Sequence, residues 1–397
     1  MSFKVPDGFS VAGVSCGIKQ DTSKLDLTLI ASDRPAVAAG VYTQNRVVSA
    51  TVVFDRTITP CKNFRVVVIN SGNANACTGE QGARDVAQMA QLAARAIDAP
   101  AEAALVLSTG VIGVYLPMDN VDAGIQTAAD RLAKTETALI AAAQGILTTD
   151  THHKLAVREL TLGAHQIRIT GMAKGAAMIG PNMATMLAVI MTDANLTKDD
   201  AQRMLGEVVA ETFNCISVEG HMSTNDSVLL LASGAAGGET LSGADLVAFH
   251  GALRDVCTEL AMAIPGDGEG VTHRITIDVD GCKSREEAHA IAKTVAESAL
   301  VKTAVAGADP NWGRIVSAAG YAGVAFDPAG VSLSVNGFQL FDHGCPVEFD
   351  EASVSTSIHE NRETRIELTF REGAASVRFW TTDLTQEYVR LNADYHT

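Results

Sequence analysis

The chain has 397 residues, of which 47% are hydrophobic, and this length and composition suit a globular protein with two cores. Its 30 Lys and Arg against 46 Asp and Glu give a formal net charge of -16, which repels nucleic acid phosphates and anionic membrane surfaces. The basic residues are scattered without a local patch, so neither nucleic acid nor a membrane is expected as a partner.

The N-terminal region and the cysteines indicate a cytoplasmic protein. The first residues lack the apolar core of a signal peptide, and no segment approaches the ~18 apolar residues that span a bilayer. The seven cysteines are widely spread and form no CxxC pair, which is typical of reduced thiols and predicts no zinc site. The sequon that begins at Asn225 is therefore interpreted as part of the structure or the chemistry, not as a glycosylation site.

Short β-rich runs alternate with amphipathic helices along the chain. Strands are predicted at 65–72, 103–110, 166–173, 186–194, 227–234, 274–281 and 375–384. Helices are predicted at 80–97, 196–213 and 284–299, with Thr197 and Ser284 as N-caps of the last two. The alternation predicts an α/β protein, and several strands are apolar enough to be covered on both faces.

The glycine-rich stretch "PGDGEG" (265–270) interrupts apolar sequence and is predicted to be a hinge or a binding loop. We place a domain boundary there, with a large α/β domain over 1–270 and a smaller C-terminal α/β domain over 271–397. The stretch "SGAAGGET" (233–240) is predicted to be a strand-to-helix loop.

Three glycine-rich or polar stretches invite a functional interpretation. "GMAKGAAMIG" (171–180) does not fit a phosphate-binding P-loop, because Lys174 precedes its glycine and no hydroxyl residue follows. "INSGNANACTG" (69–79) fits either a loop that approaches a ligand closely or an Asn-rich turn that satisfies its own backbone. In "LSTGVIG" (107–113), the hydroxyl of Thr109 and the backbone at Gly110 are suited to a developing oxyanion.

Thr185 stands at an unusual position, between the Gly-Pro-Asn turn at 180–182 and the apolar run at 186–191. From these residues alone, a threonine that caps the end of a buried strand is the simpler interpretation.

The motifs "GMAKGAAMIGPNMATMLA", "SGNANACTG", "LSTGVIG", "GILTTDT", "STNDS", "LVKTAVAGADPNWGRI" and "NADY" together resemble the bifunctional ornithine acetyltransferase (glutamate N-acetyltransferase) family of arginine biosynthesis. The resemblance runs from about Ser71 to Thr397 in the family's order. It implies layered sheets flanked by helices, and a precursor that cuts itself between Ala184 and Thr185. The products are an α chain of 184 residues and a β chain of 397 - 184 = 213 residues.

The resemblance also implies the chemistry. After the cut, Thr185 carries both a hydroxyl nucleophile and a terminal amine, whose unperturbed pKa of about 7.7–8.0 suits a base. Its Oγ takes an acetyl group from N-acetylornithine and passes it to glutamate. No metal or bound cofactor is implied, and the use of acetyl-CoA as a second donor stays open. The two chains are expected to pair again into a heterotetramer of two α and two β chains.

Individual roles follow by resemblance, with Thr109 and Gly110 as the oxyanion pair. The substrate-contacting positions are Thr148, Lys174, Thr185, Glu269, Asn392 and Thr397, so that the end of the C-terminal domain returns to the active site. Lys174 suits an α-carboxylate and Glu269 suits the ammonium group of ornithine. The competing interpretations are a solvated lysine after a strand and a loop carboxylate at a hinge.

The chain departs from the family pattern at two places. Glu219-Gly220-His221 stands where Asp-Gly-Asp is expected, and Ala177 and Gly180 stand where Gly and Ala are expected. His221 fits either a group that titrates near the working pH or a structural residue. Two other functions therefore stay open beside acetyl transfer, namely a hydrolase of the self-cleaving aminopeptidase type and a non-catalytic binding protein.

Overall fold

The computed structural model describes residues 3–178, 180 and 186–394. Its strands are β1 (Phe9–Val14), β2 (Leu27–Tyr42), β3 (Cys61–Asn73), β4 (Ala104–Val111), β5 (Lys154–Leu162), β6 (His165–Lys174), β7 (Leu187–Thr192), β8 (Ser227–Ala232), β9 (Arg274–Cys282), β10 (Ser332–Val335), β11 (Phe338–Asp342), β12 (Cys345–Pro346), β13 (Glu363–Thr369) and β14 (Ala375–Thr382). Its helices are α1 (Ala50–Arg56), α2 (Gly79–Ala96), α3 (Met118–Asp130), α4 (Glu136–Gly145), α5 (Lys198–Glu211), α6 (Gly243–Gly266), α7 (Arg285–Glu297), α8 (Ala299–Ala306), α9 (Trp312–Gly320), α10 (Glu351–His359) and α11 (Gln386–Asp394).

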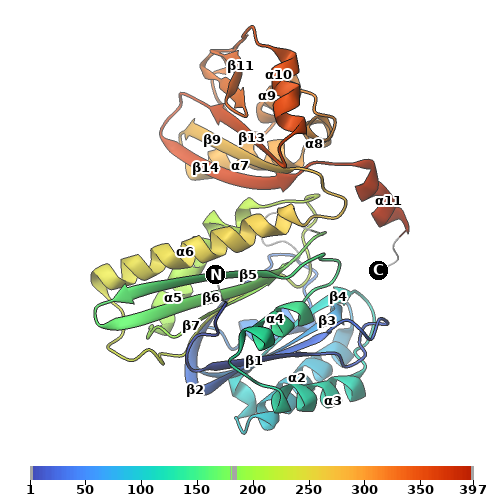
Figure 1. The fold of residues 1–397 in the computed structure, drawn as a ribbon, viewed down its shortest axis with the longest axis vertical. Coiled ribbons are helices and arrows are strands. Elements are labelled where there is room, and N and C mark those ends of the chain that lie inside the picture. Colours follow the sequence, from blue (N-terminus) through green and yellow to red (C-terminus); the bar gives the residue numbers. More distant parts are fainter. Residues whose placement is uncertain (1–2, 179, 181–185, 395–397) are drawn as a thin grey trace.

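These strands form two mixed sheets, which confirms the α/β class. The eight-stranded sheet has the order β4-β3-β2-β8-β7-β6-β5, with β1 paired to β2. The six-stranded sheet has the order β12-β11-β10-β13-β9-β14 and is built from the last third of the chain. Figure 1 shows this smaller sheet and α7 to α10 above α6, which lies on the large sheet.

The large sheet bends so that its strands form two layers around a shared core. Leu187, Val189 and Met191 of β7 face that core together with apolar residues of β3, β4 and α4. Ala188 and Ile190 face the opposite way, into the core under α5 and α6. On the far side, α2 and α3 cover β1 to β4. The arrangement is helix, sheet, sheet, helix, and burial on both faces explains why β7 is apolar from Leu187 to Met191.

The predicted strands and helix caps are confirmed at each expected place. Each of the seven predicted runs contains an observed strand, and β7 and β8 are buried throughout. Thr197 accepts a hydrogen bond from the Asp200 N–H, and Ser284 accepts one from the Glu287 N–H. The Glu287 carboxylate bonds to the N–H of Lys283, which differs from the expected capping box by one residue.

Two elements differ from the sequence interpretation. The long strand β2 was not predicted, because Asp33-Arg34-Pro35 interrupts its apolar pattern; in the structure the register shifts across this segment, between Ala31 and Ala36. The predicted loop at 265–270 begins later than expected, because α6 continues through Pro265 to Gly266. Pro265 cannot donate the helical hydrogen bond to the Ala261 carbonyl, and α6 ends one residue after it.

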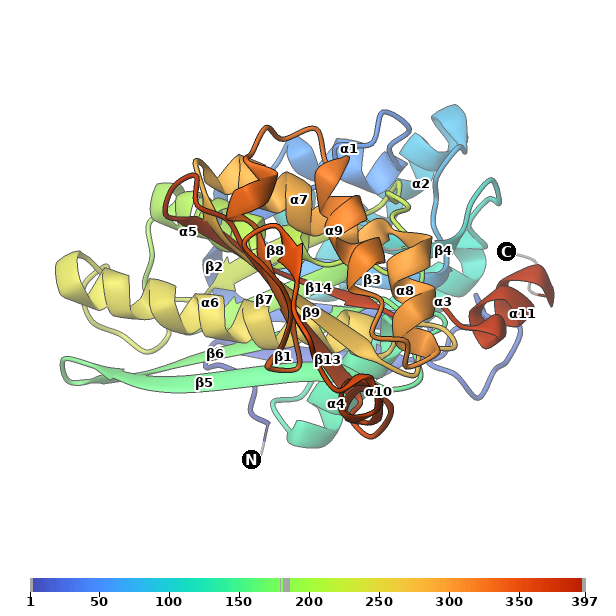
Figure 2. The same cartoon turned by 90° about the horizontal axis from the view of Figure 1, so that it is seen from above.

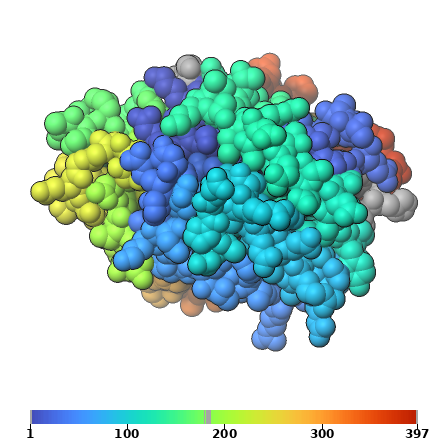
Figure 3. Space-filling model, turned by 90° about the horizontal axis from the view of Figure 1, so that it is seen from below, coloured from blue at the N-terminus to red at the C-terminus, as the bar shows by residue number. Residues whose placement is uncertain are grey.

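The C-terminal helix α11 follows β14 of the small sheet and lies beside the junction between the two sheets. Figures 1 and 2 both show it at the end of the molecule where β5 begins. The face seen in Figure 3 is covered largely by the first third of the chain, which includes α2 and α3. Within the described residues, no helix combines the length and the apolar character needed to cross a bilayer.

Candidate active site

Strand ends from both layers of the large sheet meet at one place. The parallel strands β3 and β4 end beside each other, and Gly72 pairs with Gly110 there. In the other layer, β6 ends at Lys174, which pairs with Leu187 at the beginning of β7. Leu187 also pairs with Ser227, the first residue of β8. The predicted oxyanion pair and the predicted carboxylate-binding lysine therefore lie at the ends of strands in two different layers.

Asn225 joins these two layers directly. Its side-chain amide donates to the Ala74 carbonyl at 2.6 Å and to the Ser108 carbonyl at 2.8 Å. The hydroxyl of Thr224 donates to its Oδ1 at 2.5 Å. Asn225 is 4% exposed, so the asparagine of the sequon is a structural residue, as expected. Because Ser108 precedes Thr109, this amide fixes the backbone that carries the oxyanion pair.

Asp226 continues the connection toward β7. Its Oδ1 accepts a hydrogen bond from the Met186 N–H at 3.0 Å, and its Oδ2 has no hydrogen-bond partner among the described residues. Burial raises the pKa of Asp226 to about 8, although the Met186 N–H and Lys174 lower it. A buried carboxyl with one unused oxygen thus lies next to the residue that follows Thr185.

Gly110 must be glycine for two reasons. Its φ of +132° is a conformation that other residues rarely adopt. A Cβ at this position would also lie 2.3 Å from the carbonyl carbon of Gly72, because β3 approaches closely there. Thr109 beside it is buried, with 2% exposure. The pair places a hydroxyl and a backbone N–H, two groups that can donate hydrogen bonds to an oxyanion, on consecutive residues.

Lys174 is buried, with 1% exposure, so the interpretation of a solvated lysine is wrong. Burial lowers the pKa of Lys174 to about 8, while the carboxylates of Asp150 and Asp226 raise it. A buried ammonium of this kind needs an anionic partner, and Asp150 supplies one while Asp226 holds its proton below about pH 8.

Thr148 lies in the loop between α4 and β5, close to the end of β6. Its N–H donates to Asp150 Oδ2 at 3.2 Å, and the Oδ1 of the same carboxylate accepts the Gly175 N–H at 2.6 Å. The carbonyl of Leu147 accepts a hydrogen bond from Lys19 Nζ at 2.7 Å. These contacts hold the Thr148 loop against the turn that follows Lys174.

Glu269 and Asn392 lie in contact although they are far apart in the sequence. Asn392 Nδ2 donates to Glu269 Oε2 at 3.0 Å, and the Glu269 N–H donates to the Ala176 carbonyl at 3.1 Å. Gly270 packs so closely against α11 that a Cβ on it would lie 2.5 Å from the Tyr388 nitrogen. The C-terminal helix is thereby attached to the loop after Lys174.

Three predicted site residues, Ala184, Thr185 and Thr397, lie outside the described residues. The structure brings the segments that carry Thr148, Lys174, Glu269 and Asn392 together around residues 175–176. It connects Thr109 and Gly110 to this group through Asn225 and Asp226.

The departures from the family pattern have structural counterparts. Gly180 packs against Gly220, and a Cβ on Gly180 would lie 2.2 Å from the Gly220 carbonyl carbon. Glu219 stabilises the charge of the buried Lys302, whose pKa is lowered by burial to about 8. His221 is exposed. The pair Gly180 and Gly220 links the loop before the expected cut to the altered segment.

The Asn-rich loop at 69–79 mostly satisfies its own backbone. Asn70 Nδ2 donates to the Asn73 carbonyl at 2.8 Å, and Asn75 Nδ2 donates to the Gly82 carbonyl at 3.0 Å. Asn75 itself adopts a left-handed conformation, with φ of 46°. These contacts favour the turn interpretation of this loop, which lies at the end of β3 beside Gly110.

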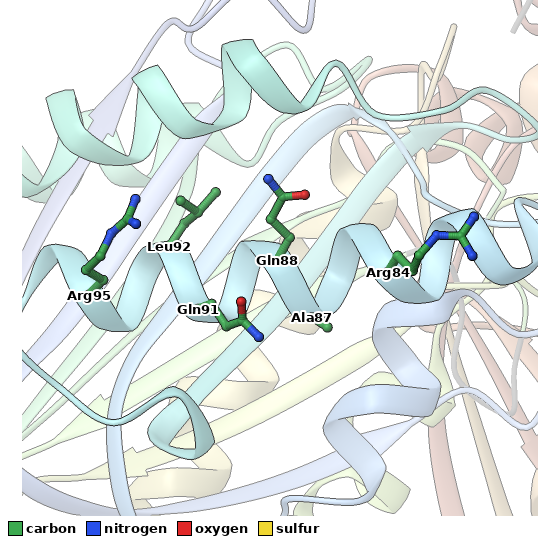
Figure 4. A pocket seen from close by; sticks show the side chains of 6 residues that line it. All are labelled: Arg84, Ala87, Gln88, Gln91, Leu92 and Arg95. Atoms are coloured by element: carbon green, nitrogen blue, oxygen red, sulfur yellow. The ribbon is translucent and has the colours of Figure 1, made fainter.

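Two surface hollows lie apart from the site residues described above, and the second is lined by residues of β2, β3 and the segment before α5. The shallow hollow in Figure 4 is lined by residues of α2 alone, none of which was predicted to be functional. Across residues 3–178, 180 and 186–394, no group of three or more His, Cys, Asp or Glu side chains could hold a metal ion.

Comparison with known proteins shows the family. The model of the ArgJ family matches residues 10–397. The chain belongs to the ArgJ family. It is 46% identical over 399 residues to the arginine biosynthesis bifunctional protein ArgJ of Rhodopirellula baltica, covering 100% of this chain and 97% of the relative. The ArgJ protein of Symbiobacterium thermophilum is 45% identical over 395 residues, covering 99% and 98%.

A crystal structure of the ArgJ protein of Bacillus halodurans is also similar. Its chain is 38% identical, with a TM-score of 0.50, and the match covers 51% of this chain and 96% of that one. These matches confirm the family resemblance and extend it toward the N-terminus, to residue 10.

Sequence reasoning gave no individual role in this site to Asp150, Lys154, Asp226 and Asp267, and expected Asn225 only as part of the structure or the chemistry. Asp150 belongs to the motif "GILTTDT", and Asn225 and Asp226 belong to "STNDS"; both motifs were used for the resemblance without a role for each of these residues. The available signal for Asn225 and Asp226 was their position just before the apolar run of β8, because polar residues at the ends of buried strands often line a site.

Proposed function

We propose that this ArgJ chain cuts itself between Ala184 and Thr185 and then transfers acetyl groups from N-acetylornithine to glutamate through an acetyl ester on Thr185 Oγ. Membership in the ArgJ family supports the proposal, because its relatives are named as bifunctional proteins of arginine biosynthesis. The length of the Bacillus halodurans crystal chain also supports it, since that chain matches about half of this one.

One observation carries the proposal, namely the path of contacts from the oxyanion pair to β7. Ser108 accepts the Asn225 amide, and Asp226 accepts the Met186 N–H. Thr109 is covalently bonded to Ser108, and Thr185 is bonded to Met186. The predicted nucleophile and the predicted oxyanion site are thereby attached to two adjacent residues, Asn225 and Asp226, which directly precede β8.

The cut follows from the same chemistry as the transfer. Thr185 Oγ attacks the Ala184 carbonyl, the C–N bond breaks, and the proton of the hydroxyl goes to the departing amine. Water then hydrolyses the ester, which leaves a carboxylate on Ala184 and a free hydroxyl and amine on Thr185. The oxyanion that forms in each step needs donors placed in advance, a role that suits Thr109 and Gly110.

The transfer uses two half-reactions. Thr185 Oγ attacks the acetyl carbonyl of N-acetylornithine, and the terminal amine carries the proton from Oγ to the departing nitrogen of ornithine. The amine of glutamate then attacks acetyl-Thr185 and regenerates the hydroxyl. Lys174 binds the α-carboxylate of either amino acid, and Glu269 with Asn392 faces the ammonium of ornithine.

A hydrolase of the self-cleaving aminopeptidase type would use the same nucleophile. The difference lies in what attacks the acetyl ester. An amine that is held in position reacts over a barrier about 7–11 kcal/mol lower than that of a freely diffusing amine. The buried ammonium of Lys174 favours such a hold on an amino acid, and therefore favours the transferase.

Initial rates with both substrates test the proposal. Parallel double-reciprocal lines are expected for N-acetylornithine and glutamate, with acetate release much slower than transfer, and the Thr185→Ala chain should be inactive. Rapid acetate release that glutamate does not suppress would show that the protein is a hydrolase and not a transferase. Assays with acetyl-CoA as the only donor decide whether it is a second acetyl source.

We also propose the assembly and the division of the chain that the family implies. The α and β chains pair again into a heterotetramer, with 1–270 as the catalytic domain and 271–397 as the domain whose end returns to the site. Light scattering on the purified protein measures the assembly, and a mass equal to one α plus one β chain would overturn it.

A further inference from the structure

Three buried charged side chains form a cluster that the proposed chemistry does not use. Lys154 Nζ donates to Asp150 Oδ1 at 2.6 Å and to Asp267 Oδ2 at 2.6 Å. The side chains of Asp150 and Lys154 are fully buried, and that of Asp267 is 2% exposed. We refer to these three residues as the Lys154 cluster. Because water is excluded, the two ion pairs of Lys154 hold the three side chains in fixed relative positions. Asp150 also interacts with Lys174, and Asp267 Oδ1 lies 3.1 Å from His152 Nδ1.

Each carboxylate of the Lys154 cluster also holds backbone from another segment. Asp150 accepts the N–H groups of Gly175 and Thr148. Asp267 accepts the Thr151 N–H at 3.1 Å and the Thr151 hydroxyl. The cluster therefore ties three segments together: the loop before β5, the turn after β6, and the chain that leaves α6.

These three segments carry three of the six predicted substrate contacts, namely Thr148, Lys174 and Glu269. Thr148 stands two residues before Asp150, and Glu269 stands two residues after Asp267. Lys174 directly precedes the glycine whose N–H the Asp150 carboxylate accepts. Each of these three contacts is thus at most two residues from a hydrogen bond of the Lys154 cluster. The spacing is short enough for the cluster to fix their relative positions.

We propose that the Lys154 cluster positions the substrate-binding residues, so that it determines the affinity for the amino-acid substrates without touching the reacting atoms. Asp267 is the member that sets the position of Glu269, because it attaches the end of α6 to β5. Asp150 sets the position of Lys174 and also stabilises its positive charge. The inference rests on the proposed acetyl transfer, whose failure the wild-type assay reveals separately.

The test is a comparison of Asp267→Asn with Asp193→Asn. Asp193 is also a buried aspartate that accepts backbone N–H groups, from Arg168 at 2.7 Å and Asp7 at 3.2 Å, but it follows the opposite end of β7. Asp267→Asn keeps the size of the side chain and weakens its bond to Lys154. We expect Asp267→Asn to raise KM for N-acetylornithine and for glutamate about tenfold with kcat within about threefold, and Asp193→Asn to change neither.

Two additions keep the test decisive. Thr151→Val removes one hydrogen bond to Asp267 and leaves every charge in place. It should raise both KM values by less than Asp267→Asn does, and it still tests the inference if Asp267→Asn folds poorly. The amount of acetyl group that the enzyme takes up in the first turnover gives the number of cut active sites, and kcat is calculated per cut site. A wild-type enzyme that transfers acetyl, with unchanged KM in Asp267→Asn and Thr151→Val, would overturn the inference alone. An Asp267→Asn chain that folds but remains uncut would overturn it as well, and would assign the cluster to the self-cleavage.

Discussion

Affinity for glutamate should fall as pH rises through about 8, because Lys174 loses its charge there. Burial lowers the pKa of this lysine from 10.5 to about 8. At that pKa about 90% of the side chain is charged at pH 7 and about 10% at pH 9, by the usual titration relation. If only the charged form binds the α-carboxylate, the dissociation constant rises about tenfold across this interval.

Titration calorimetry with glutamate between pH 6.5 and 9 measures this change on the mature enzyme without turnover. Lys174→Met is the control, because it keeps a long side chain without a charge. Its dissociation constant should be about 10- to 150-fold higher at pH 7, as expected for one lost charged hydrogen bond, and should hardly change up to pH 9. A wild-type constant that stays level to pH 9, or a Lys174→Met profile that follows the wild type, would refute this role of Lys174.

Three further predictions concern the strand ends at the site. Thr109→Val should lower kcat about 10²- to 10³-fold with little change in KM, since its hydroxyl acts where charge develops; a change confined to KM in steady-state assays would make Thr109 a binding residue. Asn225→Ala should lower the free energy of unfolding in urea by about 1–3 kcal/mol, because two buried carbonyls lose their donor, whereas the same change at the less buried Asn195 should cost less. Asp226 has its pKa raised from 3.8 to about 8, so the folded chain keeps a proton that the unfolded chain releases between pH 4 and 8. Stability of the uncut Thr185→Ala chain should therefore decrease as pH rises across that window, and Asp226→Asn should reduce this slope; an unchanged slope would show that Asp226 is ionised.

Local features of the fold and the site could be predicted from the sequence. The apolar run of β7 predicted a strand buried on both faces, and the polar residue followed three positions later by an acid predicted the caps at Thr197 and Ser284. The motif at Thr109 and Gly110 predicted an oxyanion pair, and the strand geometry gives Gly110 a conformation that glycine alone adopts readily. These signals are short in range, because each depends on a few neighbouring residues.

The contacts between distant segments could not be predicted in this way. Asn225 bonds to Ser108 across 117 residues, and Lys154 bonds to Asp267 across 113 residues. Nothing in either local pattern marks such partners, since a lysine at the beginning of a strand is usually solvated. Likewise β2 was missed because its bulge interrupts the alternation that defines a strand. The sequence indicated the catalytic motifs, and the structure was needed to find the residues that hold them in place.

Intact-mass measurement of the wild-type protein with N-acetylornithine tests the central claim most directly. The account predicts two chains, of 184 and 213 residues, with the longer one heavier by a single acetyl group that glutamate removes, and one uncut and unmodified chain for Thr185→Ala. A wild-type protein that transfers acetyl groups as one intact chain of 397 residues would contradict it.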